Sequence, residues 1–346
     1  MEQRPAPPTV VDDMGRFRFG TYTTPIFTPD FAPARLSDVS PFIGGPHRKG
    51  LGGWLRSMRQ KEWQHFTLIS DEILVATGIA QLGYVGNVFC HVIDRHTGEC
   101  HSFERIIPFG KAIGFSPSSV RGTTSWRQGS DHLSFEYQPV GSGLWSCTFN
   151  LPLGSERLKG QVSLHPEGEC LALVFPLDSN RAAYTHKEAG NDAEGLLTLG
   201  PRELHFSHGA QGAVDWTRGF LDRRTTWNWL CGAGLSGDGR RLGINLSEHV
   251  YGGAENAIWL EGVMHLIGPV TFTLPNQAGE PWRINSDKCS IELHPDCSRS
   301  QHVDYRLVKS DFTQYFGAMD GYVRFGGGLM QVTGLYGVCE VHEAVW

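Results

Sequence analysis

The 346 residues include 30 Lys and Arg against 36 Asp and Glu, a formal net charge of −6 that excludes the overall basic surface of a nucleic-acid-binding protein. The 19 Phe and 10 Trp exclude a disordered chain, and 43 Gly without a Gly-X-Y period exclude collagen. The length is enough for two domains or for one large β structure.

The N-terminal region is rich in proline and shows little periodicity. We predict that Met1–Gly50 is an extended arm that lies over the body of the protein. The region has no basic segment followed by an apolar run, so we expect no secretory signal and a cytoplasmic protein. No run has the length and apolar character of an integral membrane segment, and we expect none.

The chain continues in short apolar or alternating runs separated by Gly, Asn, Asp and Ser, which is the pattern of antiparallel strands. Trp54–Trp63 fits either a short helix or the entry of a strand. Val88–Ile93 and Cys100–Ile107 flank the turn-forming residues Arg95–Gly98, which predicts a hairpin. Long amphipathic helical patterns are absent, so we predict an all-β fold.

The polar segment Asp178–Gly195 is the best candidate for an internal boundary, because it is rich in turn-forming residues. It divides the body into a first domain over residues 51–190 and a second over residues 191–346. We predict two antiparallel β-barrels or sandwiches in tandem, since such structures leave few strand edges exposed.

Strand periodicity assigns the side chains of the second half to faces. In Thr225–Cys231, Trp227 and Trp229 share one face, which is either core or the lining of a pocket. In Leu242–Ser247, three apolar residues alternate with Asn245, which points to the opposite face.

The run Asn256–Ile267, taken as one strand, places three candidate residues on one face: Trp259, Glu261 and His265. In an open sheet, Glu261 and His265 face water. In a barrel that binds a ligand, they converge with Asp215 and Asn245 on a cavity lined with Trp. An enclosed carboxylic acid there has a raised pKa and can protonate an alkene or a leaving group.

Asp215 and Arg218 lie three residues apart in a turn-rich stretch. We expect the two side chains to form an ion pair, with a catalytic Asp215 as the alternative. The variant Asp215→Asn separates the two roles. Lost turnover with nearly unchanged thermal stability indicates a catalytic acid, and a large loss of stability indicates an ion-pair partner.

Common catalytic and cofactor motifs are absent, including the nucleophile elbow, the Walker loop, H-E-x-x-H and the Rossmann glycine pattern. We therefore expect no cofactor. The eight cysteines form no C-x-x-C pair, so we expect buried free thiols and no metal site.

Four stretches, taken together as an ordered set, resemble the domain of unknown function 2804 family: Trp54–Phe89, Gly212–Gly234, Leu242–Ile267 and Gln314–Trp346. The resemblance covers nearly the whole chain from about Leu51 and implies a doubled, lipocalin-like β fold. More distantly, the chain is similar to carotenoid hydratases and lipocalin-like cyclases. That similarity implies Asp215 as an acid beside tryptophan walls that steady a carbocation.

We therefore expect a cofactor-independent enzyme that acts on an apolar or polyene-like small molecule by proton transfer, as a hydratase, isomerase or cyclase. The candidate catalytic residues are Asp215, Glu261 and His265. The candidate substrate-binding residues are Trp216, Arg218, Trp227, Trp229, Asn245 and Trp259. The alternatives are a carrier protein for a hydrophobic ligand and a scaffold whose barrels are filled by their own side chains. The sequence leaves the oligomeric state open.

Overall fold

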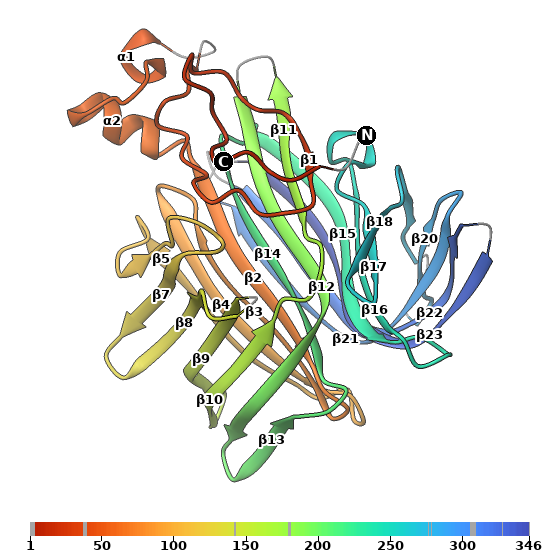
Figure 1. Ribbon diagram of the computed structural model, residues 1–346. Helices are drawn as coiled ribbons and strands as arrows, with labels where there is room; N and C mark the ends of the chain where they lie inside the picture. Colours follow the sequence, from red (N-terminus) through yellow and green to blue (C-terminus); the bar gives the residue numbers. More distant parts are fainter. Residues whose placement is uncertain are drawn as a thin grey trace.

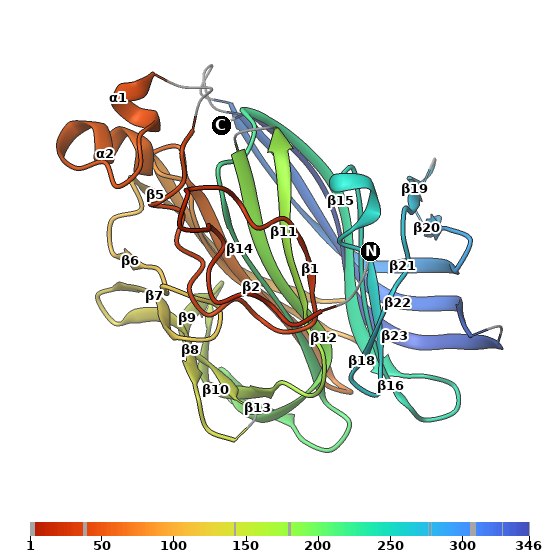
Figure 2. The same ribbon diagram turned by 45° about the horizontal axis from the view of Figure 1, so that its top comes forward.

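Two curled antiparallel sheets make up nearly all of the protein (Figures 1 and 2). The computed structural model describes residues 4–36, 40–141, 143–178, 181–275, 277, 279–304, 309–326 and 328–345. The outer ends of the predicted arm and of the predicted second domain, residues 1–3 and 346, lie outside these ranges. The predicted all-β fold, with two lipocalin-like units in tandem, is confirmed.

The first sheet has 14 strands, and its main path runs β5-β4-β3-β2-β14-β12-β10-β9-β8-β7-β6. Its strands are β1 (Gly20–Tyr22), β2 (Lys61–Ile69), β3 (Ile73–Gln81), β4 (Val85–Asp94), β5 (Cys100–Pro108), β6 (Ile113–Gly114), β7 (Gly122–Gln128), β8 (Asp131–Gln138), β9 (Leu144–Leu153), β10 (Glu156–His165), β11 (Leu171–Asp178), β12 (Arg181–Leu199), β13 (Arg202–Phe206) and β14 (Gln211–Gly219). The predicted hairpin around Arg95–Gly98 is the pair β4 and β5.

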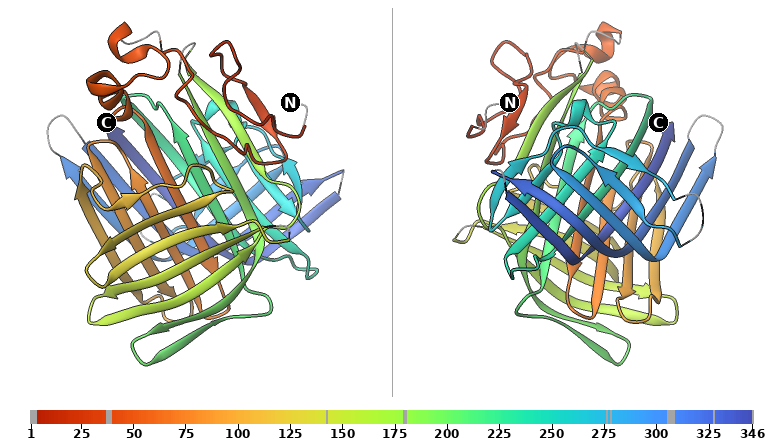
Figure 3. Two further views of the ribbon diagram at one scale, coloured as in Figure 1. Left: turned by 60° about the vertical axis from the view of Figure 1, so that its left-hand side comes forward. Right: turned by 90° about the vertical axis from the view of Figure 1, so that its right-hand side faces the viewer.

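The second sheet has nine strands in the order β18-β17-β16-β15-β23-β22-β21-β20-β19. Its strands are β15 (Arg224–Leu235), β16 (Arg241–Glu248), β17 (Ala257–Leu260), β18 (Val263–Leu266), β19 (Thr271–Thr273), β20 (Trp282–Asn285), β21 (Cys289–Asp304), β22 (Lys309–Phe325) and β23 (Gly328–Val345). In the right-hand view of Figure 3, the blue strands of this sheet lie in front of the orange strands of the first.

Short helices precede the first long strand: α1 (Pro41–Gly44) and α2 (Gly50–Ser57). A single turn of 3-10 helix, η1 (Tyr251–Gly253), follows β16. The segment Trp54–Trp63 therefore combines both predictions, because it holds the end of α2 and the start of β2. No helix in the described ranges combines the length and the apolar character that crossing a membrane requires.

Two predicted segments have a different structure. Asp178–Gly195, expected to be an irregular boundary, contains most of the long strand β12, because its polar residues lie on a strand paired on both sides. Asn256–Ile267, taken as one strand, is instead the hairpin β17–β18. Glu261 and Gly262 have φ of 49° and 76°, and two successive positive φ values make a tight turn between the strands.

The apolar core is divided into layers. Alternating residues fill the interior of each sheet, as in β10, where Leu158, Val162 and Leu164 are buried. The predicted apolar face of β16 is likewise buried inside the second sheet. A third layer lies between the sheets and joins residues of both, such as Ala213 on β14 and Phe316 on β22. This layer fixes how the two sheets face each other.

The N-terminal arm packs onto the outer side of the first sheet (Figure 1). Its strand β1 pairs with β11, and Val10, Ile26 and Phe31 are fully buried against the sheet. The backbone N–H of Ile26 donates to the Tyr184 hydroxyl at 2.9 Å. The guanidinium of Arg56 donates to the carbonyl oxygen of Phe31 at 2.9 Å, which ties α2 to the arm.

Candidate active site between the two sheets

Two adjoining cavities, of about 410 and 360 Å³, lie between the sheets. Pockets that bind small molecules have volumes of roughly 300–1,000 Å³. Both cavities are lined by the same five residues: Trp63, Asp215, Trp227, Trp229 and Glu340. The larger one has mostly apolar walls, and the smaller one extends towards Lys187 and Glu255.

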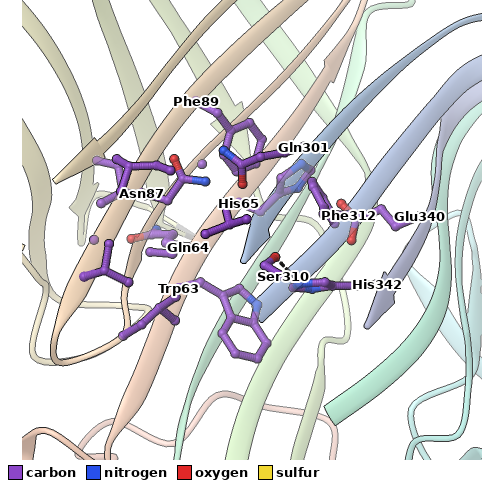
Figure 4. A pocket seen from close by; sticks show the side chains of 18 of the residues that line it. Trp63, Gln64, His65, Asn87, Phe89, Gln301, Ser310, Phe312, Glu340 and His342 are labelled. Atoms are coloured by element: carbon purple, nitrogen blue, oxygen red, sulfur yellow. Dashed lines mark hydrogen bonds between the residues drawn. The ribbon is translucent and has the colours of Figure 1, made fainter. Parts of the chain in front are cut away.

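Three strands each place two alternate residues at the larger cavity: Trp63 and His65 from β2, Trp227 and Trp229 from β15, and Glu340 and His342 from β23. Strand geometry explains this arrangement, because residues two apart point to the same face. The register between β15 and β23 sets Trp227 opposite His342 and Trp229 opposite Glu340. Figure 4 shows the β2 residues and the β23 residues on the walls of the same pocket.

Aromatic rings make up much of the cavity wall. The indoles of Trp63 and Trp227 are stacked, with centroids 6.1 Å apart and planes 18° apart. His65 meets Trp229 edge-on at 5.4 Å, and His342 meets Trp227 edge-on at 4.2 Å. The faces of such rings carry negative potential, so the cavity can stabilise a cation formed inside it.

Glu340 is one of two buried carboxyl groups on the described wall of this cavity, and the other is Asp215. The Oε1 of Glu340 accepts a hydrogen bond from Gln314 Nε2 at 2.6 Å, and its Oε2 accepts a longer one from Trp227 Nε1 at 3.4 Å. Burial raises the pKa of Glu340 to about 7. Around neutral pH a large share of Glu340 therefore carries a proton, as a general acid must.

The two histidines of the cavity are neutral at physiological pH. Burial lowers the pKa of His65 to about 4 and that of His342 to about 3. His342 Nε2 shares a hydrogen bond of 2.9 Å with the Ser310 hydroxyl, drawn in Figure 4. His65 Nε2 is buried and has no hydrogen-bond partner among the described residues.

Asp215 forms an ion pair with a buried cation. Lys187 Nζ lies 2.7 Å from Asp215 Oδ2 and 2.6 Å from Glu255 Oε1. Burial alone would lower the pKa of Lys187, but the two carboxylates raise it, so the amine stays charged. Thr217 and Trp63 also donate to the Asp215 carboxylate, at 3.0 and 3.3 Å. Both oxygens of Asp215 therefore have partners, at the edge of both cavities.

Arg218 does not pair with Asp215 as the sequence led us to expect. Its Nε donates to Glu62 Oε2 at 2.6 Å, because residues three apart on a strand point to opposite faces. Trp216 also points away from the cavities. It is fully buried beneath the arm, where its Nε1 donates to the Ser116 hydroxyl at 3.0 Å.

Two further candidates for substrate binding lie outside the cavity walls. Asn245 Oδ1 accepts from Trp229 Nε1 at 2.8 Å, and Asn245 Nδ2 donates to the carbonyl of Glu255 at 2.8 Å. Asn245 therefore fixes the orientation of an indole that lines both cavities. Trp259 donates to the carbonyl of Glu169 at 2.7 Å and lines neither cavity.

The structure does not bring Glu261 and His265 to Asp215. Glu261 lies in the exposed turn of the β17–β18 hairpin, where its carboxylate accepts from the backbone N–H of Arg241 at 2.6 Å. His265 packs against the ring of Phe325, with centroids 4.5 Å apart. A single strand would have placed Glu261 and His265 on the same face. The turn at Glu261 separates the two strands of the hairpin, so the two residues do not share one.

Sequence reasoning placed Asp215, Trp227 and Trp229 at a cavity but missed His65, Glu340 and other residues of its wall. The side chains of β2 and β23 alternate between two faces as those of β15 do. The sequence therefore indicated which residues of each strand share a face. What the sequence lacked was the pairing of β23 with β15, which brings residues more than one hundred positions apart to one wall.

One group of the described residues has the donor types of a metal site: Cys170, His186 and Glu188, all buried. Hydrogen bonds already occupy this group. His186 Nε2 lies 2.9 Å from Glu188 Oε1, its Nδ1 lies 2.7 Å from the Ser119 hydroxyl, and Asn191 donates to Glu188 Oε2 at 2.9 Å. Internal partners thus account for the side chains of His186 and Glu188.

Comparisons with known proteins agree with the architecture. CghA, solved with Sch210972, has a TM-score of 0.57 at 12% identity, over 93% of this chain and 97% of that chain. The NE1406 protein of Nitrosomonas europaea has a TM-score of 0.50 at 13% identity, over 82% and 92%. Kievitone hydratase of Nectria haematococca has a TM-score of 0.46 at 11% identity, over 83% and 88%. The first two likenesses show a shared fold.

Sequence comparison gives one family and no individual relative. Residues 4–346 match the family described as "Domain of unknown function (DUF2804)". No curated protein matches the chain.

Proposed function

The chain belongs to the DUF2804 family, and we propose that it is a cofactor-independent enzyme that transfers a proton to an apolar or polyene-like small molecule in the cavity between its two sheets. The reaction is a hydration, an isomerisation or a cyclisation. Glu340 is the proton donor in this proposal, and the stacked indoles of Trp63 and Trp227 stabilise the cation that forms.

The observation that carries the proposal is the buried acid Glu340 in an aromatic cavity. A carboxylic acid in such a place keeps its proton near neutral pH and is strong enough to protonate an alkene or a leaving group. Of its two oxygens, Oε2 has the weaker hydrogen bond, at 3.4 Å. That oxygen is the one we assign to carry the proton, and Trp227 positions it.

The second half of the reaction needs a base or a positioned water molecule. His65 is neutral, faces the same cavity and has an Nε2 without a hydrogen-bond partner among the described residues. It is suited to hold the water that adds to the cation or to remove a proton from it. Asp215 acts through Trp63, whose indole N–H it accepts, and is a positioning residue in this proposal.

A protein of the same fold offers further support. CghA has been solved with Sch210972, so a chain with this architecture accommodates a ligand. From CghA we infer only that this fold can hold a ligand. The chemistry rests on the residues of this chain.

Incubation in deuterated water with a panel of apolar alkenes and polyenes tests the proposal. Proton transfer inserts deuterium into the recovered compound, and hydration also adds the mass of water, both of which mass spectrometry detects. We expect labelling by the wild type, and at least about a 100-fold loss in Glu340→Gln. The control Glu343→Gln changes an exposed carboxylate of the same strand and should label normally.

A different outcome would favour the carrier protein. In that outcome, compounds bind tightly to wild type and to Glu340→Gln alike and are recovered from both without deuterium. This result would contradict an enzymatic function. It would leave a cavity that holds a hydrophobic ligand without transforming it.

A further inference from the structure

Two cysteines from different sheets meet at the junction between the sheets. Cys100 begins β5 of the first sheet, and Cys297 lies on β21 of the second. Both are free and partly exposed, whereas the other six cysteines are buried. Arg299, two residues after Cys297 on β21, contacts both the sulfur and the carbonyl oxygen of Cys100. Residues two apart on a strand point to the same face, so Cys297 faces β5 beside Cys100 although 197 positions separate the two cysteines along the chain.

A guanidinium group faces the sulfur of Cys100. Arg299 Nε lies 3.2 Å from Cys100 Sγ, and its Nη2 donates to the carbonyl of Cys100 at 2.6 Å. The Ser102 hydroxyl is 3.5 Å from the same sulfur. The hydrogen bond from Cys297 and the charge of Arg299 outweigh burial and lower the pKa of Cys100 to about 6. Cys100 is thus largely a thiolate at neutral pH, which is the nucleophilic form.

Cys297 has the complementary state. Its hydrogen bond to the sulfur of Cys100, together with burial, raises the pKa of Cys297 well above the usual value. It therefore keeps its proton. A thiolate beside a protonated thiol is the arrangement of an attacking and a resolving cysteine in oxidant-sensitive pairs.

The two strands that carry the cysteines also line the larger cavity. Ile106 and Pro108 line it from β5, and Gln301 and Val303 line it from β21. Gln301 Nε2 donates to Glu104, a second polar link between these strands. A covalent bond between the two cysteines would therefore connect two strands that line the cavity.

We propose that Cys100 and Cys297 are a modification site that reacts with hydroperoxides and closes into a disulfide between the two sheets. The Cys100 thiolate attacks one peroxide oxygen, the O–O bond breaks, and hydroxide leaves as Cys100 becomes a sulfenic acid. The sulfur of Cys297 then attacks Cys100, loses its proton and expels the second hydroxide. Two thiols are oxidised by two electrons, and hydrogen peroxide is reduced to two waters.

Mass spectrometry of the folded full-length protein, treated with about one equivalent of hydrogen peroxide, tests this site. We expect the loss of two hydrogen masses, a cross-linked peptide pair that contains Cys100 and Cys297, and reversal by dithiothreitol. Cys297→Ser should stop at a sulfenic acid on Cys100 that dimedone traps. Cys100→Ser should remain unmodified at Cys297. These masses are independent of turnover, so the site can be confirmed or rejected whatever the enzyme assay shows.

The role of the guanidinium has its own test. Arg299→Gln should slow the oxidation of Cys100 by roughly tenfold at neutral pH, because the thiolate fraction falls. An unchanged rate would contradict the assigned activation. Oxidation of one of the buried cysteines before Cys100, or a wild-type protein that stops at the sulfenic acid, would overturn the proposed pair.

Discussion

At the scale of single residues, the central feature is a carboxyl group that folding takes out of water without a hydrogen-bonded cation among the described residues. The groups that donate to Glu340 in this part of the chain are neutral, Gln314 and Trp227. Asp215, at the edge of the same cavities, instead has the amine of Lys187. The two carboxyl groups therefore have different surroundings, and burial raises the pKa of Glu340.

This difference predicts how stability depends on pH. The folded pKa of Glu340, about 7, lies above its ordinary value of 4.5. The contribution of Glu340 to the free energy of unfolding is therefore fully present below about pH 4.5 and is lost as pH rises through about 7. Glu340→Gln cannot ionise, so we expect it to be more stable than wild type at about pH 8, by up to about 3 kcal/mol, and equal at about pH 4.5.

Urea unfolding at both pH values measures this effect. The exposed control Glu343→Gln should shift neither curve relative to wild type. A Glu340→Gln variant that is less stable than wild type at about pH 8 would mean that folding does not raise the pKa of Glu340.

Asp215→Asn should lower the free energy of unfolding by about 3 kcal/mol, because it leaves Lys187 buried with one carboxylate partner fewer. The sequence left open whether this variant would report catalysis or an ion pair, and the structure now predicts the loss of stability. Thermal unfolding of Asp215→Asn, Lys187→Met and the double variant measures the coupling. Additive losses would show that the two side chains do not interact.

At the scale of elements, alternation within a strand was readable from the sequence, and the turns that interrupt a strand were not. The faces of Trp227 and Trp229 on β15 were predicted correctly from the strand period of two. The Glu261–Gly262 turn was missed because Glu seldom takes a positive φ, and a turn there reverses every later assignment. Polar residues of β12 were mistaken for a loop because they face partners on a second strand.

Contact between the sheets also depends on one glycine pair that no periodicity reveals. β12 bulges at Gly190, which has a φ of +84°, and packs against Gly243 on β16. A Cβ atom on Gly243 would lie 2.1 Å from the carbonyl oxygen of Ala189, backbone that cannot move aside cheaply. The two sheets approach this closely only because both residues lack side chains.

Gly243→Ala should therefore destabilise the protein by about 2 kcal/mol or more by forcing the sheets apart. Chemical unfolding measures the loss. Gly237→Ala is the matched control, because a Cβ atom there meets open space, and it should be close to wild type. Equal stabilities of the two variants would contradict a close contact between β12 and β16.

At the scale of the whole molecule, the cavity exists because two curved sheets meet along an apolar layer that does not fill all the space between them. Neither sheet alone contains the site, since β2 carries Trp63 and His65 while β15 and β23 carry the facing residues. The sequence predicted two β units and a Trp-lined cavity. It could not place that cavity between the units, because the pairing of distant strands sets it.

Binding of an apolar probe tests this location. Trp227→Ala should weaken the affinity for 1-anilinonaphthalene-8-sulfonate by about tenfold, because it removes one of two stacked indoles from the cavity. Fluorescence titration measures the affinity. Trp54→Ala changes an exposed indole on α2 and should bind as wild type does. Equal weakening by both variants would place the probe elsewhere.

The proposed proton transfer depends on a protonated Glu340 inside the cavity at neutral pH. A difference infrared spectrum between wild type and Glu340→Gln, recorded from about pH 5 to about pH 9, isolates the C=O band of this one carboxylic acid. We predict that the band persists to about pH 7 and then disappears as the group ionises. Its absence already at about pH 5 would show an ordinary ionised glutamate and would contradict the proposed proton donor.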